Sequence, residues 1–204
     1  VVGMKAILWC NGANPDSSIL DEVLSNDAEV FGVDGGADKA AEEGVLVNEV
    51  LGDLDSIDIT RWKGEATELF DQNNSDLAKA IEVLTARGYT EIDVIGTEGG
   101  TSSHILGNWA ALCDAPGGAR IRIHHNDSIT SRFHPDDEEM EFLAGEGEVF
   151  SVFALVPGKV WISGARWDIQ GEHLGMSTRG MNNEGSGGIV SLRSEGVLAV
   201  IRPR

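Results

Sequence analysis

The sequence predicts an α/β protein with a parallel-sheet N-terminal domain, flanking helices and a C-terminal all-β sandwich domain. Over the first two-thirds of the chain, short apolar runs alternate with segments of helical periodicity, which is typical of a parallel sheet covered by helices. Beyond residue 120 the helical period disappears, and short alternating runs separated by Gly and polar residues indicate antiparallel strands. We therefore expect two domains, residues 1–138 and 139–204.

The N-terminal strands and helices are expected to alternate along the chain. The expected strands are residues 5–10, 29–33, 48–51, 66–70 and 91–95. The expected helices are residues 37–43, a helix after residue 74, and a helix marked by Ile105, Trp109 and Leu112. The helix after residue 74 is the best marked, because Leu77, Ile81 and Leu84 recur at helical spacing and Gly88 can end it.

The C-terminal region is expected to contain strands only. They are residues 120–124, 129–133, 149–156, 160–163, 167–169, 189–192 and 197–201. The acidic, Pro-containing stretch 134–141 separates the second of these strands from the third, and we expect the domain division close to it.

Composition excludes several classes of function. The chain has 204 residues, of which 41 % are hydrophobic, enough for a sizeable core, and its net charge is −19 because 34 Asp and Glu oppose 15 Lys and Arg. Such a field repels nucleic acids and anionic membranes, so a polyphosphate ligand would need a metal ion or a local basic pocket. The two cysteines have no zinc or disulfide spacing, and no segment has the pattern of a membrane span or signal peptide. We expect a cytoplasmic protein. The scattered acidic residues by themselves indicate a solubility or salt-adapted surface, so only acids in a special spacing count toward a site.

Four polar, Gly-containing loops follow predicted strands. They are residues 34–36, 52–56, 71–76 and 96–104. Because ligands of parallel sheets bind beyond the carboxyl ends of the strands, we expect these loops to meet at one site.

Asp53 and Asp55 stand two residues apart in the second loop. In an extended segment both carboxylates would face the same side, where Mg²⁺ would relieve their repulsion. The alternative is that Asp55 caps a turn or helix while Asp53 is solvated.

Asp34 directly precedes Gly35 and Gly36. Gly lets a phosphate approach the backbone at a helix N-terminus, although a tight turn with Asp34 as the helix cap explains the same residues.

The segment from Asp71 to Lys79 combines a helix start with polar groups. In a functional interpretation, Ser75 and Lys79 bind phosphate and Asp76 binds a metal ion or the substrate. The alternative is a capped helix with an Asp76–Lys79 ion pair one turn apart.

Taken together, these segments resemble the thiamine pyrophosphokinase family, whose motifs they follow in order along nearly the whole chain. The corresponding segments here are Asp34-Gly35-Gly36-Ala37, Gly52-Asp53-Leu54-Asp55-Ser56, Asp71-Gln72 through Ser75-Asp76 to Lys79-Ala80, Gly96 to His104, Gly164 to Trp167 and Arg179 to Glu184.

The resemblance implies Mg²⁺-dependent transfer of pyrophosphate from ATP to the hydroxyl of thiamine, which gives thiamine diphosphate and AMP. It implies these site residues: Asp34, Asp53, Asp55 and Asp76 as the catalytic acids, the last three as metal ligands; Gly35, Gly36, Gln72, Ser75, Lys79, Gly96, Gly99, Gly100 and Thr101 for the nucleotide; and Trp167, Asn182 and Asn183 for thiamine. The thiamine pocket would lie at a homodimer interface. By its sequence alone, Trp167 could also be a core residue of the sandwich.

Two departures from the family pattern matter most, because Thr101 and Ser103 stand where the family has Arg and Asp. Asn182 in place of Ser and Ser75 in place of Thr are milder changes. The lost Arg removes a bidentate phosphate contact. Arg132 and Arg166 are candidates to replace it. The changes leave open an enzyme for a different acceptor alcohol, or a non-catalytic binder of nucleotide or thiamine.

Overall fold

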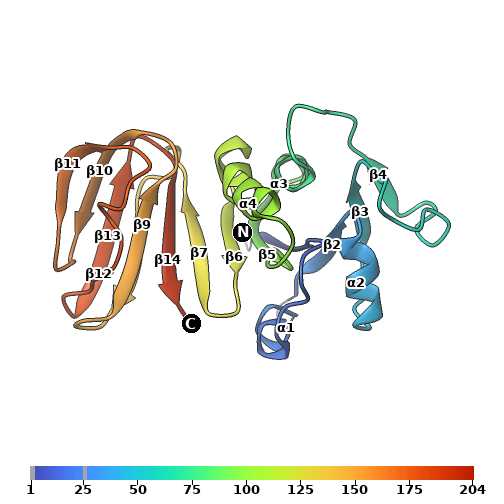
Figure 1. The fold of residues 1–204 in the computed structure, drawn as a ribbon, viewed down its shortest axis with the longest axis horizontal. Coiled ribbons are helices and arrows are strands. Elements are labelled where there is room, and N and C mark those ends of the chain that lie inside the picture. Colours follow the sequence, from blue (N-terminus) through green and yellow to red (C-terminus); the bar gives the residue numbers. More distant parts are fainter. Residues whose placement is uncertain (1–2, 25–26) are drawn as a thin grey trace. The chain divides into compact units, whose positions relative to one another are not determined.

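The computed structural model describes residues 3–24 and 27–204 (Figure 1). Two compact units divide the chain, the first ending at Asn126 and the second spanning Asp127–Arg204. Strand pairing is mixed over the chain, because it is parallel throughout the first unit and antiparallel throughout the second. No helix among the described residues is long and apolar enough to cross a membrane.

The first unit is built on a parallel sheet with strand order β6-β5-β1-β2-β3-β4. Its strands are β1 (Met4–Trp9), β2 (Glu29–Val33), β3 (Glu49–Gly52), β4 (Ala66–Glu68), β5 (Tyr89–Ile95) and β6 (Arg120–His124). Its helices are α1 (Ser17–Leu24), α2 (Gly36–Glu42), α3 (Asp76–Ala86) and α4 (Ser102–Asp114).

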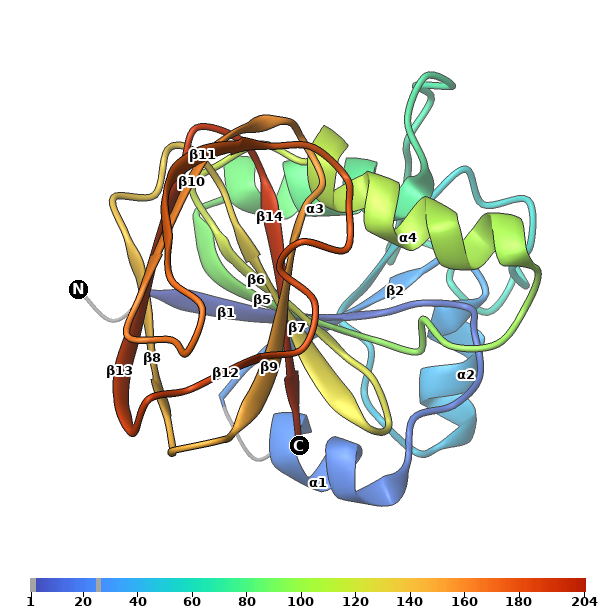
Figure 2. The same ribbon diagram turned by 60° about the vertical axis from the view of Figure 1, so that its left-hand side comes forward.

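Helices cover both faces of this sheet, with α1 and α2 on one side and α3 and α4 on the other (Figure 2). On the α1 side, Ile19 and Val23 pack into one apolar cluster with Ile7 and Trp9 of β1. The strands β1 and β5 are fully buried at their centres, as expected for strands covered on both faces. Because these strands are parallel, their carboxyl ends all lie at one edge of the sheet, and the strand order reverses between β1 and β5.

The second unit contains two antiparallel sheets around one apolar core. One sheet has the order β12-β9-β14-β7 and the other β11-β10-β13-β8. The strands are β7 (Ser128–Phe133), β8 (Met140–Ala144), β9 (Val149–Ala154), β10 (Gly158–Ser163), β11 (Ile169–Leu174), β12 (Asn183–Glu184), β13 (Gly188–Ser194) and β14 (Leu198–Pro203). Side chains from both sheets, such as Phe150 of β9 and Leu192 of β13, enter the same buried cluster.

The compact units divide after residue 126, whereas the sequence analysis placed the division after residue 138. The difference is the strand β7, which pairs along its whole length with β14 of the second unit. Two expected loops are also regular structure, because α1 and β8 were not anticipated. The strand β8 begins inside the acidic stretch 134–141, and its alternate residues Met140, Phe142 and Ala144 pack against the core.

Candidate functional site

A cleft of about 560 Å³ lies at the carboxyl ends of the strands of the first unit. Its walls come from the loop after β1, Asp34 after β2, the loop after β5 and the first turns of α3 and α4. The strands β2 and β5 flank β1 on opposite sides, so the cleft sits where the strand order reverses. This is the usual ligand position in an open parallel sheet.

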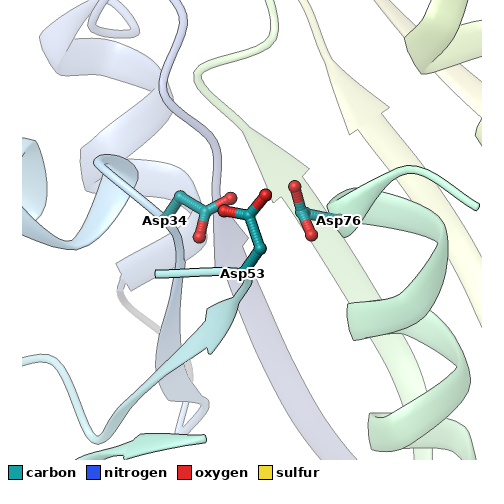
Figure 3. Close-up of side chains that lie close together, drawn as sticks. All are labelled: Asp34, Asp53 and Asp76. Carbon is teal, nitrogen blue, oxygen red and sulfur yellow. The ribbon is translucent and has the colours of Figure 1, made fainter. Parts of the chain in front are cut away.

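Three carboxylates from separate segments converge at this edge (Figure 3). Asp34 follows β2, Asp53 follows β3 and Asp76 begins α3. One oxygen from each lies within 4.8 Å of the others. Asp34, Asp53 and Asp76 are called the acid triad below.

Asp34 is the most buried member of the triad, with 9 % of its surface exposed. Its backbone has a positive φ of 46°, and its Oδ1 accepts a hydrogen bond from the Leu54 N–H at 3.1 Å. Burial, reinforced by the negative charge of Asp76 against the opposing Leu54 hydrogen bond, raises the pKa of Asp34 to about 7. The N-cap position of α2 is Gly35 and not Asp34.

Gly52 allows Asp34 to take this position. A Cβ on Gly52 would lie 1.9 Å from Asp34 Oδ1, so a larger residue would displace the carboxylate from the triad.

Asp53 and Asp55 do not form the extended pair that their spacing predicts. Leu54 between them has a φ of 63°, so the segment turns, and Asp53 Oδ1 accepts a hydrogen bond from the Asp55 N–H at 3.2 Å. The carboxylate of Asp55 is exposed and lies outside the acid triad. Its pKa is raised, mainly by the negative charge of Asp53.

Asp76 faces the triad and also forms an ion pair with Lys79. Lys79 Nζ lies 2.6 Å from Asp76 Oδ1 and donates a hydrogen bond to the Leu69 carbonyl at 3.0 Å. Ser75 caps α3, because its Oγ accepts a hydrogen bond from the Ala78 N–H at 3.3 Å. The contacts of this segment therefore match the alternative, capped-helix interpretation, and Lys79 does not line the cleft.

The acid triad fits a hard divalent cation such as Mg²⁺. It offers only oxygen atoms, which Mg²⁺ prefers. In addition, Asp76 Oδ1 is buried, with the Lys79 ammonium group 2.6 Å away. Such an oxygen is costly to bury unless a cation balances it, and Lys79 balances a single charge of the three carboxylates.

Two loops are joined by backbone hydrogen bonds to form the floor of the cleft. The Gly12 N–H donates to the Gly96 carbonyl at 2.8 Å, and the Ala13 N–H donates to the Glu98 carbonyl at 2.6 Å. A Cβ on Gly12 would lie 2.3 Å from the Gly96 carbonyl oxygen, so the loops approach closely only because residue 12 is Gly. Gly99 and Gly100 also line the cleft, both with positive φ.

The loop after β1 and the side chain of Lys39 are site features that the sequence analysis missed. Lys39 lines the cleft and donates hydrogen bonds to the carbonyls of Asn11 and Gly12. The available signals were an Asn-Gly pair directly after a strand and a Lys five positions beyond Asp34.

The remaining nucleotide candidates have other placements. Gly35 and Gly36 are buried, and the Gly35 N–H donates to Ser56 Oγ at 3.3 Å. Gln72 is exposed outside the cleft lining. Thr101 caps α4 by accepting a hydrogen bond from the His104 N–H at 3.4 Å, whereas Ser103 lines the cleft.

In the second unit, Trp167 and Asn183 belong to one hydrogen-bonded corner. Trp167 is 47 % exposed, so it is not a core residue of this unit. The buried Asn183 side chain accepts from the Trp167 N–H at 3.2 Å and donates to the Trp167 carbonyl at 2.9 Å. Asn182 is exposed, with a φ of 53°. Asn183 therefore presents the Trp167 ring at the surface.

The two arginines considered as replacements for the family Arg have local partners. Arg166 lies 4.7 Å from the centre of the Trp167 ring and forms an ion pair with Glu184 at 2.8 Å. Arg132 is buried within the second unit, with 2 % of its surface exposed.

Comparison with known proteins relates this chain and its fold to one group of enzymes. The family model for the thiamine pyrophosphokinase catalytic domain matches residues 20–123. The structure is similar to thiamine pyrophosphokinases from Bacillus subtilis, with a TM-score of 0.75 at 19 % identity over 98 % of both chains, and from Geobacillus thermodenitrificans, with 0.73 at 20 % identity over 98 % of both. The yeast enzyme has a TM-score of 0.74 at 10 % identity over 100 % of this chain and 87 % of its own. No match was found among curated proteins.

Proposed function

Because the chain belongs to the thiamine pyrophosphokinase family, as its motifs predicted, we propose that it transfers pyrophosphate from ATP to the hydroxyl group of thiamine. The products are thiamine diphosphate and AMP. The observation that carries the proposal is the acid triad, whose members come from three separate segments and meet beside the cleft.

The chemistry requires little more than positioning and charge control. The hydroxyl oxygen of thiamine forms a bond to the β-phosphorus of ATP, and the bond between that phosphorus and the α–β bridging oxygen breaks. The bridging oxygen leaves with AMP, and a carboxylate of the acid triad accepts the hydroxyl proton. The joined loops after β1 and β5 support a role in holding the nucleotide at the strand ends.

Asp34, Asp53 and Asp76 would hold Mg²⁺, with Asp55 beside them in the same turn. Bound there, Mg²⁺ would neutralise phosphate charge and orient the polyphosphate. The acid triad needs such a partner, because an anionic substrate must otherwise approach three carboxylates in a chain of net charge −19.

The second unit supplies the proposed thiamine site. The exposed ring of Trp167 offers an aromatic face to the cationic thiazolium. Asn183 is hydrogen bonded to the backbone of Trp167, and Asn182 directly precedes Asn183 in sequence. A homodimer interface remains the proposed location of this site.

The test is to mix the protein with Mg²⁺, ATP and thiamine and to identify both products. AMP and thiamine diphosphate in equal amounts support the proposal, whereas ADP as the only nucleotide product contradicts it. A panel of pterin and pyrimidine alcohols then tests the acceptor, since Ser103 lines the cleft where the family has Asp. AMP formed only with another alcohol would redirect the proposal to that substrate, and stabilisation by ATP without turnover would indicate a binding protein.

A further inference from the structure

We propose that Lys39 binds the polyphosphate of the nucleotide and, through the same ammonium group, sets the position of the loop after β1. This inference rests on the proposed function, because it concerns the same cleft. It assigns to Lys39 the phosphate contact that the sequence analysis gave to Lys79.

The first argument is the supply of positive charge in the cleft. Among the described residues that line it, Lys39 is the one Lys or Arg. The other nearby cation, Lys79, is 7 % exposed and is engaged by Asp76 and by the Leu69 carbonyl. Among the described residues that line the cleft, Lys39 is therefore the one that offers an incoming polyphosphate an ammonium group not paired with a carboxylate.

The second argument is the environment of the Lys39 ammonium group. Two of its N–H groups donate to the main-chain carbonyls of Asn11 and Gly12, at 3.0 Å to the first. These neutral partners hold the charge in place without cancelling it. An ammonium group has three donors, so one remains for a phosphate oxygen.

The third argument is the position of the contacted carbonyls. Residues 11 and 12 directly follow β1, and Gly12 is hydrogen bonded to Gly96 of the loop after β5. Lys39 thus connects α2 directly to the loop after β1 and, through Gly12, to the loop after β5. Charge and loop position are separable, because losing the charge weakens phosphate binding whereas losing the loop position weakens binding of the whole nucleotide.

The experiment is calorimetric titration of the full chain, in the presence of Mg²⁺, with ATP, inorganic pyrophosphate and adenosine. Lys39→Gln, which loses the charge but keeps N–H donors for the loop carbonyls, should raise the Kd for ATP and for pyrophosphate about 10-fold or more, while the Kd for adenosine changes less than about 2-fold. Lys39→Met, which also removes those donors, should raise the Kd for adenosine as well. Lys39→Arg should recover most of the affinity. Lys159→Met in β10 removes the same charge from an exposed ion pair with Glu195 and should leave all three constants unchanged.

Each outcome bears on the inference. An equal loss of affinity for ATP and adenosine in Lys39→Gln would overturn the phosphate contact, and unchanged ATP binding by a folded Lys39→Met variant would overturn the whole inference. If Lys39→Met does not fold, unchanged ATP binding by Lys39→Gln would overturn the phosphate contact in the same way. Failure of the unaltered protein to bind ATP would instead contradict the proposed function itself, independently of any Lys39 variant.

Discussion

The ammonium group of Lys79 lies 2.6 Å from Asp76 Oδ1, one turn along the same helix. The pair is nearly excluded from solvent on the Lys79 side, where the side chain is 7 % exposed, compared with 27 % for Asp76. Lys79 therefore offsets part of the negative charge of the acid triad from the buried side of Asp76. This assigns it a structural and electrostatic role in preparing the site.

Replacing Lys79 by Met should lower the free energy of unfolding by roughly 1–3 kcal/mol, because it leaves a partly buried carboxylate without its cation. Saturating Mg²⁺ should reduce this deficit, since a bound divalent ion would replace the lost charge. Urea unfolding with and without Mg²⁺ measures both effects. Lys63→Met removes the same charge at an exposed position and serves as the control. An identical deficit in the two conditions would argue against a cation beside Asp76.

Much of the fold could be predicted from local sequence patterns. The expected strands 29–33 and 120–124 have those bounds in the structure, and Leu77, Ile81 and Leu84 are all buried on one side of α3. The helix α1 was missed because it has only eight residues, and its buried Ile19 and Val23 make sense only against the sheet. Here tertiary packing decides a structure that local propensity leaves open.

The candidate site was predictable in its location but not in its details. The principle that loops meet at the strand ends brings Asp34, Asp53 and Asp76 together from far apart in the chain. The turn at Leu54 separates the Asp55 carboxylate from the acid triad. In this turn the Leu54 N–H donates a hydrogen bond to Asp34, which lies 20 residues earlier in the chain. Likewise, the Lys39 side chain is held at the cleft by hydrogen bonds to carbonyls of the loop after β1. The spacing of residues around Lys39 in the sequence does not reveal this contact.

Asp53 and Asp55 should differ strongly in their effect on turnover. Asp53→Asn removes a carboxylate of the acid triad and should lower kcat/KM for AMP formation about 100-fold or more. Asp55→Asn changes an exposed carboxylate outside the triad and should lower it less than about 10-fold. Steady-state assays of both variants, with circular dichroism to confirm an intact fold, measure the contrast. Equal losses would show that both carboxylates contribute comparably.

The stability of the metal-free protein should fall as the pH rises, through Asp34. Its pKa is raised to about 7 in the folded chain, whereas the unfolded chain has the ordinary value of 3.8. The folded state therefore binds the proton more tightly, and the resulting stabilisation is complete below about pH 4 and lost as the pH rises through 7. Between pH 5 and pH 8 the loss from this group should be roughly 1–3 kcal/mol.

Asp34→Asn tests this origin, because it keeps an oxygen for the Leu54 N–H but cannot ionise. In chelator-treated protein, urea unfolding at pH 5 and pH 8 should show a smaller difference for this variant than for the unaltered chain. Added Mg²⁺ should stabilise the unaltered chain more at pH 8, where the carboxylate is free to bind it. A variant that retains the full pH dependence would assign the effect to other groups.

Substitutions at Asn183 and at Trp167 should affect different properties, the first the stability of the fold and the second the binding of thiamine. Asn183→Ala leaves the Trp167 N–H and carbonyl without the partners they have now, so the free energy of unfolding should fall by roughly 2–4 kcal/mol. Asn182→Gly, at an exposed position whose positive φ suits Gly, is the matched control and should change stability little.

Trp167→Ala should change the KM for thiamine more than the free energy of unfolding, the reverse of the effect expected for Asn183→Ala. The ring is 47 % exposed and covered on one side by Arg166, so its removal should cost little stability. If the ring binds the thiazolium, the KM for thiamine should rise about 5-fold or more while the KM for ATP stays constant, because a cation–π contact contributes about 1 kcal/mol or more. Thermal melts and steady-state kinetics over both substrates measure this. An unchanged KM for thiamine in a stable variant would exclude Trp167 from the acceptor site, because loss of the fold could not explain that result.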